Sequence, residues 1–345
     1  MLTLCACESL TATASNRLFQ FNRLFQLNVK LSVAVVEKLI QRGLNVNAVT
    51  TDTWNAFHYL CASARCRDMV QVVRLLIRSG LDVHARTGRG ENALTVLCRN
   101  SENPNLMETA RLLVTEHNLN VNHTNGMGNN ALHCLVSRNL YEEGNVLELT
   151  RFLIASGINV NALTYQGNDA LQLLILEEHS SENGDHAIEL IRILAEAGID
   201  PDNNNSLTLL CKNARDPLLS LVTHLFVTEF GVDVNQTNNL GENALHCLFQ
   251  NPTKSRHLLE IVEFLIGANF MVNSVTADGS NALHLLCKFV KNDHLLDLVR
   301  LLVNAGVDVR ALTGDGKSAV SLLWARKEKI PNATEIVQFI LDSPI

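Results

Sequence analysis

Residues 281–287 read NALHLLC, and residues 298–303, a little further along the chain, read LVRLLV. The first stretch opens with an asparagine, whose side chain can accept a hydrogen bond from the unpaired N–H groups at the start of a helix. Leu283 and Leu286 are three residues apart and therefore lie on one face of that helix. The second stretch has helical spacing too, and it stops at Gly306, a residue type that closes helices in the left-handed conformation. The sequence here predicts a helix, a turn, a second helix and a stop.

The same unit recurs along most of the chain. One apolar anchor marks each copy, at Phe57, Leu94, Leu132, Leu171, Leu207, Leu245, Leu283 and Val320. Successive anchors are 36 to 39 residues apart, which is typical of stacked helical repeats. A residue able to cap a helix stands two positions before each anchor, at Asn55, Asn92, Asn130, Asp169, Asn205, Asn243, Asn281 and Ser318. The second helices stop at Gly43, Gly80, Asn118, Gly157, Gly198, Gly231, Asn269 and Gly306. We therefore predict an all-α repeat solenoid of about eight repeats.

A short extended segment and a glycine turn follow each stop, as in DVHA at residues 82–85 before Gly90. This pattern predicts a hairpin-like finger between repeats. The distance from a stop to the next anchor is 14 residues in seven cases, but only nine from Gly198 to Leu207. We therefore expect a degenerate finger near residues 200–206.

Two segments of each unit resemble a known family. GVDVR at residues 306–310 is similar to the G-A-D-V-N segment of ankyrin repeats, and GENALHCL at residues 241–248 is similar to their G-x-T-P-L-H-x-A segment. The resemblance covers about residues 33 to 341. We assign residues 33–345 to the array and residues 1–32 to an irregular N-terminal segment with a possible remnant helix. Relative to the family pattern, the units carry Asn-Ala in place of Thr-Pro.

The units are also longer than the family pattern between the anchor and the next stop. We expect this extra length to lie entirely between the two helices, as longer turns or extended helix ends. Examples are Asn100–Pro104, Glu142–Asn145 and Ser180–Asp185.

Composition excludes several classes of function. A net charge of -7 argues against nucleic-acid binding, which needs clustered Lys and Arg. No apolar stretch is long enough to span a membrane, and the N-terminus lacks the basic region of a secretion signal. Nine cysteines, with none in C-x-x-C spacing, favour free thiols in a reducing compartment. We expect a monomeric cytoplasmic protein that binds neither nucleic acid nor membranes.

Repeated histidines and cysteines suggest a metal site, but their spacing does not support one. His58, His133, His246 and His284 occupy the histidine position of the family motif. Equivalent residues in stacked repeats lie about 10 Å apart, too far to share a zinc ion whose bonds are about 2.1 to 2.3 Å long. The resemblance implies a structural role, in which these histidines form hydrogen bonds near the turn. We expect Cys61, Cys98, Cys211 and Cys287 to act as small buried hydrophobic residues. No catalytic motif is present, so we expect no cofactor and no enzymatic activity.

The resemblance implies that the protein binds an unidentified partner protein through its fingers and inner helices. Tryptophan, tyrosine and arginine are enriched in binding hot spots, and methionine is an adaptable apolar contact. The candidate contacts on the fingers are Trp54, Arg86, Arg89, Met127, Tyr165 and Arg310. Two alternatives stay open: a sensor of small ligands or nucleotides that uses Arg86, Arg89 and Lys317, or the recognition half of a degradation or effector adaptor.

Overall fold

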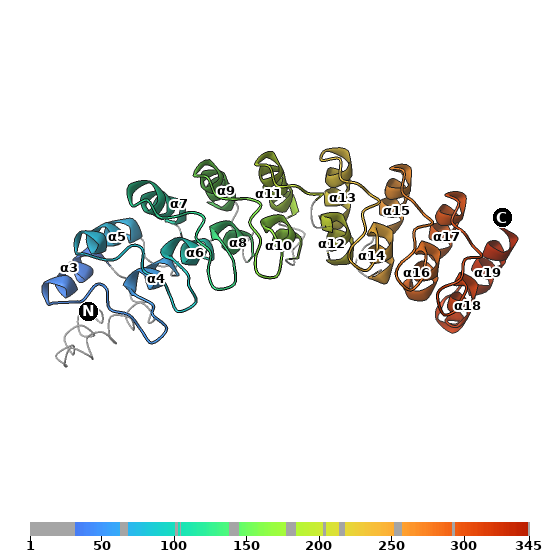
Figure 1. Ribbon diagram of the computed structural model, residues 1–345, viewed down its shortest axis with the longest axis horizontal. Helices are drawn as coiled ribbons and strands as arrows, with labels where there is room; N and C mark the ends of the chain where they lie inside the picture. Colours follow the sequence, from blue (N-terminus) through green and yellow to red (C-terminus); the bar gives the residue numbers. More distant parts are fainter. Residues whose placement is uncertain are drawn as a thin grey trace. The chain divides into compact units, whose positions relative to one another are not determined.

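The computed structural model describes residues 32–343, apart from 63–67, 101–102, 104, 138–144, 177–183, 203–204, 214–217, 252–256 and 292–293. Within these residues the chain is a series of helix pairs joined by fingers (Figure 1). They contain no β-strand, and Leu312 and Ser318 form an isolated antiparallel bridge. The described chain is therefore all-α, as predicted.

The first helix of each pair is short. These helices are α4 (Ala56–Cys61), α6 (Ala93–Cys98), α8 (Ala131–Val136), α10 (Ala170–Leu176), α12 (Ser206–Asn213), α14 (Ala244–Gln250), α16 (Ala282–Phe289) and α18 (Ala319–Trp324). Most of them begin at the expected cap: the Asn281 side chain, for example, accepts a hydrogen bond from His284 N at 3.1 Å. Asn205 differs, because its φ is 59° whereas the caps are extended. The degenerate finger brings the chain into α12 without the usual extended approach.

The second helix of each pair is longer, in the case of α7 through the π-helix Leu112–Glu116 that continues it. These helices are α5 (Met69–Arg78), α7 (Leu106–Arg111), α9 (Asn145–Ala155), α11 (Gly184–Glu196), α13 (Leu218–Thr228), α15 (Leu258–Gly267), α17 (Leu295–Asn304) and α19 (Ala333–Asp342). A further long helix, α3 (Val33–Gln41), precedes the first pair, and a 3-10 turn, Lys327–Lys329, lies between α18 and α19.

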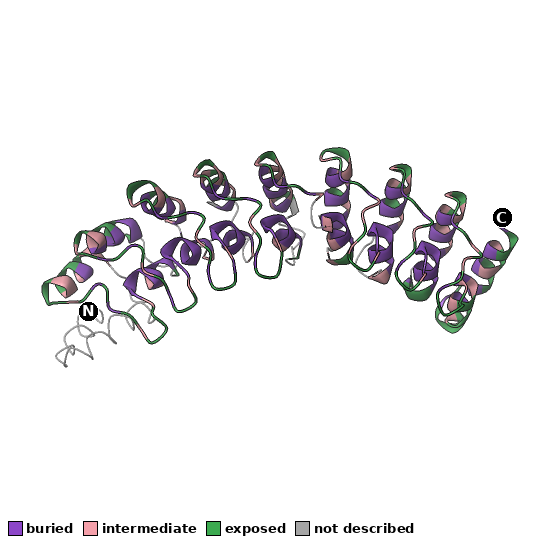
Figure 2. Ribbon diagram, viewed as in Figure 1, coloured by how far each residue is buried: buried purple, intermediate pink, exposed green. Residues whose placement is uncertain are grey.

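Contacts divide the chain into two compact units. Unit 1 runs to Leu173 and includes Glu196–Gly198, and unit 2 comprises Leu174–Ala195 and the chain from Ile199 onward. In unit 1 the short helices α4, α6 and α8 contact one another in sequence, and so do the long helices α3, α5, α7 and α9. In unit 2 the same holds for α12, α14, α16 and α18 and for α13, α15, α17 and α19. Figure 2 shows the buried residues on the helix faces that meet. Each unit thus buries its apolar residues between neighbouring repeats.

An asparagine side chain joins many neighbouring repeats. The Asn47 amide nitrogen donates to Gly80 O at 2.7 Å, and its amide oxygen accepts from Asp82 N at 2.7 Å. Both bonds recur at three further positions, Asn122, Asn235 and Asn273. We call these four residues the asparagine clips. His84 stands at the corresponding position of one repeat, and no side-chain bond of this kind is found for it among the described residues.

We expected the extra length of the units to lie entirely between the two helices. The structure differs from this expectation in one pair. Most of the expected turns fall outside the described residues. In the second pair, however, one extra residue lies inside the second helix: five positions separate Leu113 from the stop at Asn118, against four between Leu76 and Gly80. α7 widens there into a π-helix, Leu112–Glu116, and Leu119 N closes on Leu113 O at 3.0 Å. A π turn accommodates the extra residue without shifting the finger that follows.

Candidate functional site

Seven fingers in the described ranges end in a turn closed by two backbone hydrogen bonds. In the finger before α6, Thr87 N donates to Glu91 O at 2.9 Å and Gly90 N donates to Thr87 O at 2.8 Å. Gly90 has a φ of 72°, which a residue with a Cβ adopts only with strain. The Thr87 hydroxyl also accepts bonds from Arg89 N and Glu91 N at 3.3 and 3.2 Å. The same pair of backbone hydrogen bonds closes the turns that begin at Thr50, Asn125, Thr164, Asn238, Thr276 and Thr313.

Neighbouring finger tips are joined by single backbone hydrogen bonds. In unit 1, Gly88 N donates to Asp52 O at 2.9 Å, Gly126 N to Arg89 O at 2.8 Å and Tyr165 N to Met127 O at 3.0 Å. In unit 2, Gly314 N donates to Asp278 O at 2.8 Å, and a longer bond of 3.3 Å joins Ala277 N to Leu240 O. The tips within a unit are therefore held at fixed spacing.

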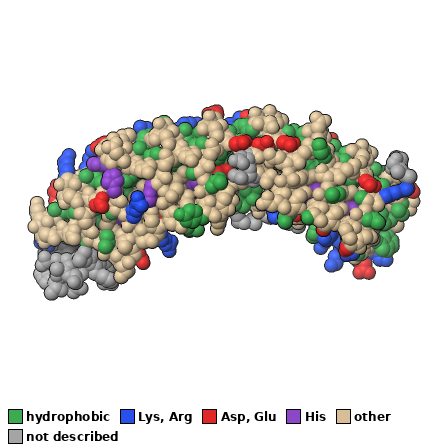
Figure 3. Space-filling view, viewed as in Figure 1, with side chains coloured by type: hydrophobic (Ala, Val, Ile, Leu, Met, Phe, Trp, Pro, Cys, Tyr) green, Lys and Arg blue, Asp and Glu red, His purple; other side chains and the backbone are tan. Residues whose placement is uncertain are grey.

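Three candidate contacts, Arg89, Met127 and Tyr165, lie on successive tips of unit 1; we call them the tip row. Arg89 is exposed, and the exposed fractions of Met127 and Tyr165 are 62% and 79%. A Cβ built on Gly128 would lie 2.9 Å from Tyr165 Cδ1, so the Tyr165 ring lies against the neighbouring finger. Figure 3 shows hydrophobic side chains and Lys or Arg side chains along the lower edge of unit 1, where Figure 1 draws the fingers. The structure brings these three residues together.

Trp54 and Arg86 are placed differently. Trp54 is half-buried, and its ring centroid lies 5.1 Å from that of Tyr59 and 6.0 Å from that of His58. Arg86 is exposed in the extended part of its finger, where its carbonyl accepts a bond from the Thr53 hydroxyl at 3.2 Å. Neither side chain is part of the tip row.

Arg310 and Lys317 belong to unit 2. Arg310 is exposed, and its backbone N–H donates to the Asp308 side chain at 2.9 Å. Lys317 is exposed and pairs with Asp315 at 2.7 Å. The ligand-sensing hypothesis combined Lys317 of unit 2 with Arg86 and Arg89 of unit 1.

Sequence reasoning missed Leu163, which lies in the same finger as Tyr165 and is 50% exposed. Apolar residues recur at its position in other fingers, at Val49, Val275 and Leu312, and all three are at least half exposed. The recurrence of an apolar residue at this position of several fingers was a signal available from the sequence.

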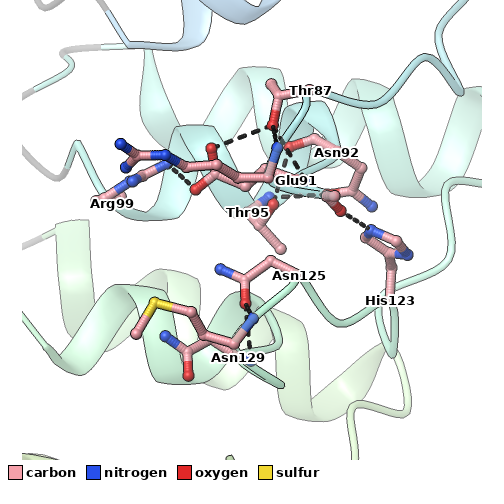
Figure 4. A network of polar contacts seen from close by, with 11 residues as sticks. Thr87, Glu91, Asn92, Thr95, Arg99, His123, Asn125 and Asn129 are labelled. Atoms are coloured by element: carbon pink, nitrogen blue, oxygen red, sulfur yellow. Dashed lines mark hydrogen bonds and ion pairs between the residues drawn. The ribbon is translucent and has the colours of Figure 1, made fainter. Parts of the chain in front are cut away.

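A buried carboxylate fastens the finger before α6 to that helix (Figure 4). Glu91 is 1% exposed, and it forms an ion pair with Arg99 at the end of α6. The Thr87 hydroxyl lies 3.4 Å from the Glu91 carboxylate, and His123 Nε2 of the next finger lies 2.6 Å from Gly90 O. The network ties two fingers to one helix.

Glu242 holds the corresponding position in unit 2. It accepts hydrogen bonds from Asn238 Nδ2 at 2.8 Å and from Gln250 Nε2 at 2.6 Å. Burial, the largest single effect, would raise the pKa of the Glu242 carboxyl, but these two hydrogen bonds and the nearby Lys212 together hold the pKa below its ordinary value. Both carboxylates are bonded to neighbouring side chains, and these bonds fix the fingers.

Each of the four motif histidines joins its own helix, α4, α8, α14 or α16, to the finger that follows. The Nδ1 atom of His246 accepts from Asn243 N at 3.2 Å, so its Nε2 carries the proton that is donated to Ser274 O at 3.1 Å. His58, His133 and His284 make the same contacts to Ala85, Ala162 and Ala311. The predicted structural role is confirmed.

The described thiols lie inside the stacks. Cys61, Cys98, Cys134, Cys211, Cys247 and Cys287 are free and buried. Burial raises the pKa of Cys134, Cys247 and Cys287 to about 12, so these thiols are protonated at neutral pH. Within the part of the chain that the structure describes, no three or more His, Cys, Asp or Glu side chains are grouped to hold a metal ion.

The described helices were also assessed as membrane spans. None of them combines the length and the apolar character that crossing a bilayer requires.

Comparison with known proteins supports the repeat assignment. The family model for ankyrin repeats matches residues 60–164 and 207–313. No curated protein matches the chain.

Proposed function

Because the chain belongs to the ankyrin-repeat family, we propose that it binds a partner protein through the tip row of unit 1. Ankyrin repeats generally serve protein–protein interaction. The observation that carries the proposal is the alignment of Arg89, Met127 and Tyr165 on three tips joined by backbone hydrogen bonds.

The tip row combines the properties of a binding hot spot. Tyr165 and Met127 expose large apolar surface, and Arg89 adds a planar group with five donors. Arg86 and Arg89 form no ion pair within the described residues, so both guanidinium groups are available to a partner carboxylate. Fixed tips lose little conformational entropy on binding, which favours affinity.

The thiols support a reducing compartment. All six cysteines in the described ranges are free, and none is placed in a disulfide. We propose that the protein acts in the cytoplasm, where such thiols persist.

Affinity purification with the full chain as bait tests the tip row. The bait variant Met127→Ser/Tyr165→Ser removes its apolar part. Val275→Ser/Leu312→Ser is the matched control, because it removes exposed apolar residues from fingers of unit 2. We expect mass spectrometry to find proteins that the wild type and the control retain and the first variant loses. An identical set of retained proteins for all three baits would contradict the proposal.

A retained protein then allows a direct measurement. We expect Arg89→Ala to weaken binding of the purified partner by about five- to thirtyfold, the range of about 1–2 kcal/mol for a hot-spot residue. Titration calorimetry measures this change. An unchanged Kd would remove Arg89 from the binding surface.

A further inference from the structure

A second surface, on unit 2, differs from the tip row in chemistry. It begins with Arg326, which follows α18 and reaches back to the preceding repeat. The Arg326 guanidinium donates to Cys287 O at 2.6 Å and to Val290 O at 3.2 Å, at the end of α16. These bonds hold the ends of α16 and α18 side by side, and α16 and α18 are in contact along the stack.

Lysines surround this junction. Lys288 Nζ lies 5.0 Å from the centroid of the Phe289 ring, and Lys327 Nζ lies 4.7 Å from that of Trp324. Lys291 and Lys329 are exposed nearby in the sequence, after α16 and in the 3-10 turn. We call Lys288, Lys291, Arg326, Lys327 and Lys329 the basic edge. In the described parts of the chain, no carboxylate forms an ion pair with any of its four lysines.

Acidic groups near the basic edge do not neutralise it. Asp278 is close enough to Lys288 for the lysine to help lower the pKa of its carboxyl, after the hydrogen bond from Thr276 that lowers it most. The Asp278 carboxylate also accepts from Ser280 N at 3.2 Å. Glu328 is exposed within the 3-10 turn. The edge therefore keeps an excess of positive charge in a chain whose net charge is -7. Figure 3 shows Lys and Arg side chains on the lower side of unit 2 near α16 and α18.

We propose that the basic edge binds an acidic segment of a partner protein. Packed helices such as α16 and α18 lie about 8–10 Å apart, a distance that about three residues of an extended chain span. Carboxylates at alternate positions of such a segment can therefore reach the lysines of both repeats. Phe289, which is 37% exposed among the lysines, offers an apolar contact to a side chain between those carboxylates.

An acidic peptide fits this surface better than a nucleic acid does. Nucleic-acid affinity grows with the number of phosphates neutralised, and the basic edge is confined to two helix ends of an acidic protein. The proposal rests on the proposed function only in taking the partner to be a protein, because it uses a different surface in the other unit.

Fluorescence anisotropy with the full chain tests the proposal. The probe is a labelled 12-residue peptide of alternating Glu and Leu; a peptide with Gln in place of Glu and a 12-nucleotide uridine RNA are the comparison probes. The variant Lys288→Glu/Lys291→Glu/Lys327→Glu reverses the charge of the edge. Lys38→Glu/Arg42→Glu/Arg78→Glu is the matched control, because it makes the same charge change at three exposed positions of unit 1. Circular dichroism verifies that both variants are folded.

We expect the acidic peptide to bind the wild type and the control, with an affinity that falls as salt is added. The edge variant should bind at least about tenfold more weakly, a change of about 1.4 kcal/mol. Binding by Met127→Ser/Tyr165→Ser should equal that of the wild type, which separates this result from the test of the tip row. Equal loss in the edge variant and the control, equal binding of the Gln peptide, tighter binding of the RNA or no binding by the wild type would each overturn the proposal.

Discussion

At the scale of single residues, the histidines that link helices to fingers must stay neutral. Their Nδ1 atom accepts a backbone N–H, and a proton there would break that bond. Burial lowers the pKa of His58 and His246 to about 4, against the smaller opposing effect of the bond to a carbonyl. The pKa values of His133 and His284 are also lowered, mainly by burial.

These pKa values predict a loss of stability in acid. The unfolded chain binds a proton at each histidine near pH 6.5, whereas folded His58 and His246 stay neutral down to about pH 4. The free energy of unfolding has its full contribution from these histidines above pH 6.5. It falls as the pH drops from 6.5 to 4, by about 1–3 kcal/mol for each histidine. We expect the double variant His58→Gln/His246→Gln to lose less stability over this range, as measured by urea unfolding. Its stability at neutral pH should fall by about 1 kcal/mol per lost hydrogen bond.

The chain itself supplies the precedent for this substitution. Gln172 takes the histidine position within α10, where its side chain accepts from Asp169 N at 3.1 Å. His84→Gln is the control, because His84 is exposed in a finger. An acid dependence that is unchanged in the double variant would refute the assignment of these histidines.

Much of this residue-scale detail follows from the sequence. The asparagine caps and the stops depend on short-range backbone chemistry, which a repeat displays several times. The structural role of the histidines was implied by the resemblance to ankyrin repeats, since their bonds reach the next finger. The half-buried position of Trp54 does not follow, because it depends on packing against His58 and Tyr59.

At the scale of the element, the finger tips depend on close contact between neighbours. A Cβ on Gly128 would lie 2.8 Å from Tyr165 N, and that backbone atom cannot move without disturbing the tip. Gly167 has nearly the same φ, 81° against 80°, but no atom lies within 4 Å of its Cβ position.

This pair of glycines gives a matched prediction. Both alanine variants should lose about 1–2 kcal/mol, because both residues are left-handed. Gly128→Ala should lose about 1–3 kcal/mol more, because its Cβ collides with the next finger. Urea unfolding of both variants measures the difference. Equal losses would mean that tip contacts do not contribute to stability.

The sequence indicated helix pairs and fingers because their signals are periodic. It did not indicate the π-helix at Leu112–Glu116, because an inserted residue looks the same in a turn as in a helix. Only the backbone bond from Leu119 to Leu113 shows how the chain absorbs the insertion.

At the scale of the compact units, neighbouring repeats within each unit contact one another along the stack. The fragment of residues 206–345 contains α12 to α19 and keeps these contacts within unit 2. We expect it to show helical circular dichroism and cooperative unfolding, because the stability of repeat arrays is a sum over neighbouring repeats. A peptide of residues 243–280, a single repeat, should be unfolded. An unfolded larger fragment would contradict this description.

The division into two units was not predictable from the repeat pattern. The unusually short step from Gly198 to Leu207 marks the region where the division falls, but periodicity cannot tell how contacts are distributed there. The sequence identified the array, and the structure assigned its repeats to units.

The asparagine clips turn individual amide hydrogens into reporters of repeat separation. The amides of Asp82, Asn159, Met271 and Asp308 are each bound by the clip of the preceding repeat. Such an amide exchanges with solvent only when the two repeats come apart or the side chain rotates away. Asn120 occupies the equivalent place after His84, where no clip reaches it among the described residues. We expect its amide to exchange faster than that of Asn159, so hydrogen exchange should reveal a boundary in unit 1 that opens without breaking a clip.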